Sequence, residues 1–248
     1  EVLAISNYPV FNPNSRGALD FAGVRNRALT DVYEPGSTIK TLTLVAALES
    51  GQFDIDSLID TSPGRIRVGS KVLHDPRDYG EVTVSNVIEK SSQVGVTKMA
   101  QAVGHEAILD VLQRFGLGEP TGTGFPGERA GVLPSMSTWS DIEKVTLAFG
   151  YGLNATPIQL ARAYAILANG GIRRPLTLLK QDQDKLPAGQ QVIDPAIAED
   201  VLSVLRRVTE PGGTATLARV QGFSVGGKTG TVHKVGKGGY LDDQYVAL

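Results

Sequence analysis

Strand-like patterns stand at the two ends of this sequence, and helical patterns fill its middle. Residues 2–6 form a short apolar run, and residues 223–235 alternate β-branched residues with glycines, both typical of strands. Between them, apolar residues recur at spacings of three and four, which predicts helices. This order predicts an α+β domain, in which an antiparallel sheet formed from the N- and C-terminal strands is flanked by helices and a helical lobe.

Caps and chain breakers mark where the predicted helices begin and end. Glu34-Pro35-Gly36 breaks the chain directly before Ser37, which places Ser37 at the N-terminus of a helix that runs until Gly51. Ser91-Ser92-Gln93 is predicted to be a turn between two helices. The other predicted helices cover residues 85–90, 94–115 with a break near Gly104, 140–149, 157–168 and 195–208, and residues 61–84 are predicted to be short strands or loop.

The composition is that of an ordinary globular protein. Of the 248 residues, 41% are hydrophobic, which is enough to bury a core as one large domain or two small ones. Lys and Arg number 24 against 26 Asp and Glu, which leaves a net charge of -2 and no basic stripe of the kind that holds phosphate backbones. Nucleic acid is therefore not an expected partner.

Cysteine and histidine usage argues against disulfides, thiol chemistry and metals. The chain has no cysteine, and its three histidines, His74, His105 and His233, stand far apart with no ligand spacing. No metal and no cofactor is expected.

The ends of the chain suggest a piece of a longer protein. No apolar run reaches the ~18 residues that a membrane-spanning helix needs. The chain begins at a predicted strand and ends at Tyr245-Val246-Ala247-Leu248, another strand-like run without a stop signal. We therefore expect a single domain over residues 1–248, truncated at both ends, with any membrane anchor outside it.

Ser37 and Lys40 are the first candidate catalytic pair. Three residues apart on a helix, they share one face and lie within reach of each other. A serine hydroxyl needs a neighbouring base, and a lysine can serve if burial or nearby cations lower its pKa. The helix N-terminus adds partial positive charge where an alkoxide would form. The same spacing also fits a helix-capping serine beside an exposed lysine.

Two further segments could complete a site. Lys228-Thr229-Gly230-Thr231, on the predicted C-terminal strand, offers a cation and hydroxyls for a substrate carboxylate, with a glycine that lets another backbone approach. Ser91-Ser92-Gln93 offers a hydroxyl for proton transfer and an amide for a peptide. Each also fits a plain structural role, as an exposed strand end and as an interhelical turn.

In this order, Ser37-Thr38-Ile39-Lys40, Ser91-Ser92-Gln93 and Lys228-Thr229-Gly230 resemble the three-part signature of penicillin-binding proteins and serine β-lactamases. Tyr33-Glu34-Pro35-Gly36 and the segments 123–128 and 149–152 resemble class B penicillin-binding proteins, particularly the transpeptidases of septal cell-wall synthesis. The likeness covers nearly the whole chain.

The resemblance implies a β-lactamase-like transpeptidase fold and a D,D-transpeptidase that cross-links peptidoglycan stem peptides and is acylated by β-lactams. It implies Ser37 as nucleophile, Lys40 as base and Ser91 as proton relay. The residues implied to bind substrate are Gln93, Lys228, Thr229, Gly230 and Thr231. The backbone N–H groups of Ser37 and Thr231 are implied to form the oxyanion hole. It further implies division proteins as partners, and a catalytic domain on the outer, periplasmic face of the bacterial cell membrane.

Two departures from the family pattern stand out. The second motif usually ends in asparagine, whereas this chain has Gln93, which moves the amide one methylene outward. We expect altered substrate or drug preference rather than an inactive site. The family's domain also continues through two more strands and a terminal helix, of which this chain has at most the beginning, so we expect an incomplete sheet.

Three other functions share part of the pattern. A β-lactamase needs a general base for deacylation, and Glu128 and Glu143 are both expected to be surface charges; the Tyr-Gly-Asn element of class D enzymes is also missing, since Leu153 follows Tyr151-Gly152. A β-lactam sensor or a catalytically weak division scaffold would keep the acylation residues. A Ser-His-Asp hydrolase using His233 lacks a Gly-x-Ser-x-Gly elbow.

Overall fold

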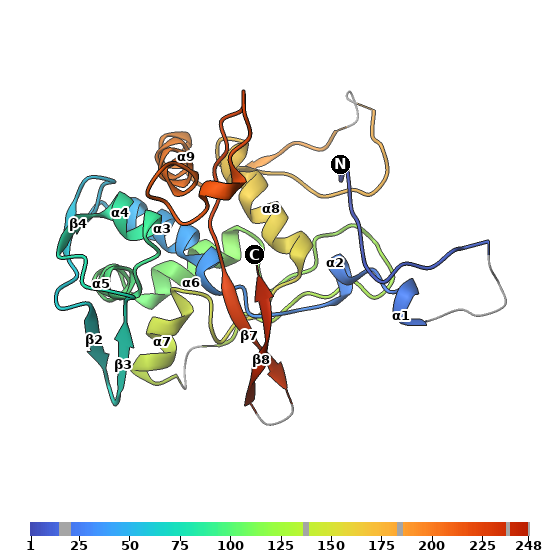
Figure 1. The fold of residues 1–248 in the computed structure, drawn as a ribbon. Helices are drawn as coiled ribbons and strands as arrows, with labels where there is room; N and C mark the ends of the chain where they lie inside the picture. Colours follow the sequence, from blue (N-terminus) through green and yellow to red (C-terminus); the bar gives the residue numbers. More distant parts are fainter. Residues whose placement is uncertain (15–20, 136–138, 183–185, 237–238, 248) are drawn as a thin grey trace.

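The computed structural model of the chain describes residues 1–14, 21–135, 139–182, 186–236 and 239–247 (Figure 1). Its α-helices are α1 (Phe21–Val24), α2 (Arg27–Thr30), α3 (Lys40–Glu49), α4 (Val84–Glu89), α5 (Gln93–Val103), α6 (His105–Arg114), α7 (Asp141–Leu147), α8 (Pro157–Ala168) and α9 (Pro195–Thr209). Among the described residues, the 3₁₀ helices are η1 (Gly36–Ile39) and η4 (Thr216–Ala218).

Helix α3 forms the centre of the core. All its residues from Lys40 to Ala47 are buried, and it contacts α4, α5, α6 and α9 around it. A helix that is apolar on every side belongs inside a protein, where each buried Leu or Val side chain contributes about 1.5–3 kcal/mol. Because η1 leads directly into α3, Ser37 on η1 and Lys40 at the start of α3 are both anchored to this buried helix.

Side-chain caps fix the ends of the surrounding helices. Thr83, Thr156 and Asp194 each accept a backbone N–H at the first turn of α4, α8 and α9, and Ser140 forms a capping box with Glu143 at α7. Each such cap stabilises its helix by roughly 1 kcal/mol. The helices predicted from caps and periodicity are therefore confirmed to within a few residues.

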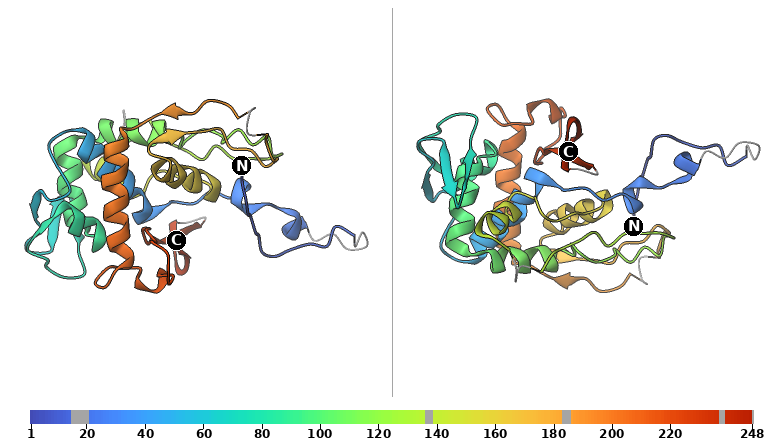
Figure 2. Two further views of the ribbon diagram at one scale, coloured as in Figure 1. Left: turned by 90° about the horizontal axis from the view of Figure 1, so that it is seen from above. Right: turned by 90° about the horizontal axis from the view of Figure 1, so that it is seen from below.

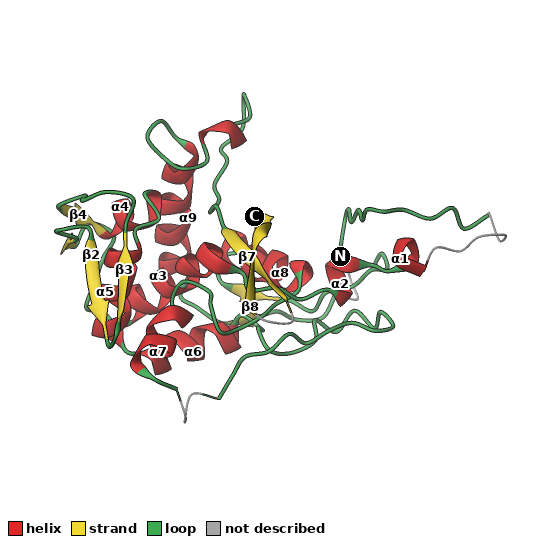
Figure 3. Ribbon diagram, turned by 60° about the horizontal axis from the view of Figure 1, so that its bottom comes forward, coloured by secondary structure: helices red, strands yellow, loops and turns green. Residues whose placement is uncertain are grey.

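In the described residues, the strands form two-stranded antiparallel pairs, shown in yellow in Figure 3. The pairs are β1 (Leu58–Asp60) with β4 (Glu81–Thr83), β2 (Arg65–Val68) with β3 (Lys71–His74), β5 (Ile172–Arg173) with β6 (Gln190–Gln191), and β7 (Thr231–Gly236) with β8 (Gly239–Ala247). In the last pair Thr231 lies opposite Ala247, and the register shifts between His233 and Val235. The α+β class with antiparallel pairing is confirmed.

The predicted N-terminal strand is wrong. Residues 2–6 adopt no strand and pair with neither β7 nor β8. Val2 donates one backbone hydrogen bond to the Thr177 carbonyl at 2.8 Å, and Leu3 and Ile5 are exposed. Figure 2 shows the N-terminus apart from the C-terminal strands β7 and β8. An apolar run becomes a strand only where a second strand satisfies its backbone groups, and periodicity does not reveal that partner.

The C-terminal strand begins later than predicted. Lys228, Thr229 and Gly230 lie outside regular structure, and β7 starts at Thr231. Gly227 donates its N–H to the Leu205 carbonyl of α9 at 3.1 Å. In the described part of the chain, the backbone of this stretch is therefore bonded to a helix and not to a neighbouring strand. Among the described residues, no helix is long and apolar enough to cross a membrane.

Candidate active site

Ser37 is the second residue of η1 and is half-buried. The turn before it depends on glycine: Gly36 has a φ of 55°, and a Cβ there would lie 2.4 Å from Cγ1 of Val232 on β7. Gly36 also donates its N–H to the Gly150 carbonyl at 3.2 Å. The nucleophile candidate is thus held where η1, β7 and the 149–152 segment meet.

Lys40 is buried to 1% exposure one turn further on, and its ammonium points at Ser91. Nζ donates to the Ser91 carbonyl at 2.6 Å and lies 3.2 Å from Ser91 Oγ. Burial lowers the pKa of Lys40 to about 7, the nearby cation of Lys228 adds to this shift, and the carboxylate of Asp75 opposes it. A lysine in this state can accept a proton near neutral pH.

Lys228 reaches the same hydroxyl from the opposite end of the chain. Its Nζ donates to Ser91 Oγ at 2.9 Å and to the Thr229 carbonyl at 3.0 Å. The side chain is 7% exposed, and burial lowers its pKa to about 8. The three predicted motifs therefore meet at one oxygen atom.

Ser91 follows α4 with a φ of 57°, the only left-handed φ outside glycine among the described residues. This conformation turns the chain between α4 and α5 and presents the Ser91 carbonyl and hydroxyl to Lys40. The predicted interhelical turn is confirmed, with Gln93 as the first residue of α5.

Asp75 is a site residue that sequence reasoning missed. Its buried carboxylate accepts hydrogen bonds from Ser92 Oγ at 2.5 Å, from the Gln93 N–H at 2.5 Å and from the Val94 N–H at 3.2 Å. It thereby fixes the start of α5 directly behind Ser91 and adds negative charge where a helix N-terminus favours it. No motif marked it, because it lies just after β3 and is 17 residues from Ser92.

The remaining predicted binding residues border this cluster. Thr229 Oγ1 lies 3.1 Å from Thr214 Oγ1, Gly230 is buried, and Thr231 opens β7. The Gln93 side chain is half-buried, and within the described part of the chain no hydrogen bond joins it to Lys40. Its amide is therefore available to a ligand.

Three other titratable candidates have structural roles. Glu128 accepts hydrogen bonds from Thr121 and Thr123, which ties together the glycine-rich loop, and Glu143 completes the cap of α7. His233 lies 3.0 Å from the Leu241 carbonyl through Nδ1. None of these three side chains is hydrogen-bonded to the lysines around Ser91 within the described residues.

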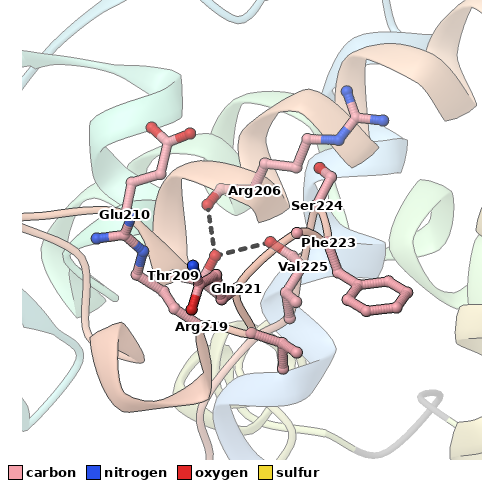
Figure 4. Close-up of a pocket in the computed structure, with 10 residues that line it drawn as sticks. Arg206, Thr209, Glu210, Arg219, Gln221, Phe223, Ser224 and Val225 are labelled. Atoms are coloured by element: carbon pink, nitrogen blue, oxygen red, sulfur yellow. Dashed lines mark hydrogen bonds between the residues drawn. The ribbon is translucent and has the colours of Figure 1, made fainter.

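A separate cavity of about 550 Å³ lies on the segment that leads to Lys228 (Figure 4). Thr209 at the end of α9 donates to the carbonyls of Arg206 and Val225 at its wall, at 3.0 and 2.7 Å. None of the candidate catalytic residues lines this cavity.

A serine at a helix start, a buried lysine one turn later and a second serine shared by two lysines, on an α+β scaffold, define a class of active-site serine proteins in which a lysine can serve as the base. Comparison with known proteins narrows that class. A family described as "Penicillin binding protein transpeptidase domain" matches residues 1–248, so the chain belongs to this family.

Two curated relatives and one solved structure give the level of similarity. The chain is 42% identical over 247 residues to "Peptidoglycan D,D-transpeptidase FtsI" of Escherichia coli K12 and 40% identical over 247 residues to "Probable peptidoglycan D,D-transpeptidase PenA" of Neisseria gonorrhoeae. Both matches cover 100% of this chain but only 41% and 42% of the relatives, so the chain spans about two-fifths of their length.

The structural match is to the "TP domain from Burkholderia pseudomallei penicillin-binding protein 3", with a TM-score of 0.86 and 38% identity over 90% of this chain and 68% of that one. The predicted class B family and the transpeptidase-like fold are confirmed.

Proposed function

We propose that this domain is the catalytic part of a septal peptidoglycan D,D-transpeptidase. The observation that carries the proposal is the meeting of Lys40 and Lys228 at the Ser91 hydroxyl. It supplies one lysine to take a proton and a second to hold an anion. The names of the similar proteins support the substrate class, because FtsI is named a peptidoglycan D,D-transpeptidase and PenA is named a "Probable" one.

In the acylation step, Ser37 Oγ attacks the penultimate D-alanine carbonyl of a donor stem peptide while neutral Lys40 accepts its proton. Backbone N–H groups of Ser37 and Thr231 stabilise the oxyanion, a contribution of roughly 3–4 kcal/mol for a donor in such a hole. The C–N bond then breaks, and Ser91 relays the proton to the departing D-alanine.

Lys228, Thr229 and Gly230 bind the terminal carboxylate of the donor, and Gln93 hydrogen-bonds its peptide. The acyl group then passes from Ser37 to an amine of a neighbouring strand, with Lys40 again holding the transferred proton. β-Lactams mimic the donor and leave a slowly hydrolysed acyl group on Ser37. Because the substrate lies outside the cell, we place the domain on the periplasmic face of the membrane, anchored by a segment beyond this chain and working with other division proteins.

Benzylpenicillin tests the nucleophile. Full-length protein incubated with the drug is expected to gain one adduct by intact mass, stable over hours, which Ser37→Ala lacks. Rapid gain and loss of the adduct with drug hydrolysis would instead favour a β-lactamase. Turnover of a D-Ala-D-Ala stem peptide with an added amine separates a transpeptidase from a sensor, because a sensor acylates once and stops.

Gln93→Asn tests the departure from the family pattern. Shortening the side chain by one methylene withdraws the amide, so we expect the ranking of β-lactams by acylation rate to change while acylation itself persists. An unchanged ranking across penicillins, cephalosporins and monobactams would show that residue 93 does not contact the drug side chain.

A further inference from the structure

Lys90 joins the catalytic Ser91 to a distant turn of the chain. It is the residue after α4, directly before Ser91, and its Nζ donates to the Gly212 carbonyl at 2.6 Å. The same ammonium pairs with Glu89 Oε1 at 2.8 Å, and Asn86 Nδ2 donates to the other Glu89 oxygen at 3.1 Å. The Lys90 and Glu89 side chains are 26% and 12% exposed. Water therefore screens the Lys90–Glu89 ion pair less than it screens a fully exposed pair.

The turn that Lys90 contacts is fixed on its other side by α9. Gly213 donates its N–H to the Glu210 carbonyl at 2.9 Å, and Ala215 donates to the Val208 carbonyl at 2.9 Å. A Cβ on Gly213 would lie 2.2 Å from the Val208 oxygen, so only glycine allows this close packing. The 210–215 turn is therefore held between the end of α9 and the Lys90 ammonium.

Thr214, in the middle of that turn, touches the predicted carboxylate-binding motif. Its Oγ1 lies 3.1 Å from Thr229 Oγ1. A hydroxyl has one proton to donate and lone pairs to accept with. If Thr214 donates to Thr229, the Thr229 proton stays available for a carboxylate; if Thr214 is displaced, that orientation is lost.

We propose that Lys90 is a positioning residue that holds the 210–215 turn so that Thr214 orients the Thr229 hydroxyl toward the substrate carboxylate. The inference rests on the proposed function and deepens it. Lys90 touches no substrate; it acts through Gly212 and Thr214 on the group that does. These contacts link Lys90, directly before Ser91, to Thr229, directly after Lys228.

A purely structural role for Lys90 makes a different prediction. A cation after the last turn of α4 also offsets the partial negative charge of the helix end, which would stabilise the fold without affecting any one ligand group. A ligand that lacks the carboxylate distinguishes the two roles. Loss of the positioning role lowers the acylation rate only for a ligand that carries the carboxylate, whereas loss of a structural role lowers it for both ligands.

The experiment uses full-length protein and two probes, benzylpenicillin and its methyl ester. Second-order acylation rates are measured for the parent, Lys90→Met, Thr214→Val and the double variant. We expect each single variant to lower the benzylpenicillin rate about three- to tenfold, the factor that one hydrogen bond supplies. The double variant is expected to match Thr214→Val alone, since Lys90 acts on Thr229 only through Thr214.

The acylation rates with the methyl ester should stay within twofold of the parent for every variant. Lys90→Arg keeps the positive charge and should restore most of the benzylpenicillin rate.

Lys98→Met is the matched control, because Lys98 likewise donates to a backbone carbonyl, that of Asp60, away from the site. Its benzylpenicillin rate is expected to equal that of the parent. Equal losses for acid and ester, or additive losses in the double variant, would overturn the positioning role. Should Lys90→Met fold poorly, Thr214→Val, on an exposed turn, still decides whether Thr229 depends on its neighbour. A parent that forms no adduct at Ser37 would instead refute the proposed function.

Discussion

Lys40 and Lys228 approach one oxygen atom, Ser91 Oγ, at 3.2 and 2.9 Å, although they stand 51 and 137 residues from Ser91 in the chain. Two ammonium groups cannot share a hydroxyl without raising the cost of each other's charge, and Lys228 is one cause of the lowered pKa of Lys40. The lysine nearer the nucleophile therefore gives up its proton first. That ordering supports the proposed roles, in which Lys40 transfers a proton and Lys228 binds an anion.

The two pKa values predict a narrow bell-shaped pH profile for acylation. The second-order rate with benzylpenicillin should rise as Lys40 loses its proton near pH 7 and fall as Lys228 loses its proton near pH 8. Stopped-flow or competition measurements across this range check it. A rate that stays flat between pH 6 and 10 would contradict the roles of both lysines.

Removing the buried lysine is expected to make the fold more stable. The folded pKa of Lys40, about 7, lies below its unfolded value of 10.5. Between these two pH values the unfolded chain therefore binds more protons than the folded chain. The free energy of unfolding consequently falls as the pH drops from 10.5 to 7. Lys40→Met should therefore raise the free energy of unfolding at pH 7 by about 1–3 kcal/mol while abolishing acylation. Thermal melts at pH 7 and pH 10 test this, and the gain should shrink at the higher pH. An equal gain at both values would exclude the charge as its cause.

Asp75→Asn should change both stability and the pH profile. Loss of the carboxylate weakens three hydrogen bonds at the start of α5, which we expect to cost about 1–3 kcal/mol. It also removes a charge that raises the pKa of Lys40, so the acidic limb of the acylation profile should move to lower pH. Asp56→Asn, an exposed acid without these contacts, is the control and should leave the limb in place. A limb that does not move would mean that Asp75 acts only as a helix cap.

Two glycines with nearly the same backbone angle test the support behind Ser37. Gly150 has a φ of 87° and Gly122 a φ of 84°, so alanine meets similar backbone strain at both. A Cβ on Gly150 would lie 2.2 Å from the Gly36 carbonyl oxygen, whereas one on Gly122 meets no atom within 4 Å. Gly150→Ala should lower acylation at least tenfold beyond Gly122→Ala, since it displaces the turn before the nucleophile. Equal rates for the two variants would show that the 149–152 segment does not set the position of Ser37.

The sequence was most informative where local chemistry decides structure. The caps at Thr156 and Asp194 and the break before Ser37 depend on neighbouring residues, and the helices that they predict are present. Local signals misplaced the first strand and the start of β7, because strand formation depends on a partner elsewhere in the chain.

The same contrast between local and long-range signals applies to the residues of the site. Helix spacing and a family pattern identify Ser37, Lys40, Ser91 and Lys228 in the sequence. The convergence of Lys40 and Lys228 on Ser91 is visible only in three dimensions. No motif marks Asp75. Its importance comes from contacts with residues 92–94, which follow it in the chain after strand β4 and helix α4. Long-range partners of this kind are set by packing, which a single sequence does not encode locally.

The left-handed φ of Ser91 has a consequence for how this domain can drift under mutation. Glycine would adopt that angle without the roughly 1–2 kcal/mol that a side chain costs there. A single exchange to glycine at position 91 would relieve this backbone cost and, in the same step, remove the hydroxyl that Lys40 and Lys228 contact. Under the proposed function, a lineage that keeps this protein only as a scaffold is expected to lose Ser91, and a lineage that still needs the cross-linking reaction is expected to retain it.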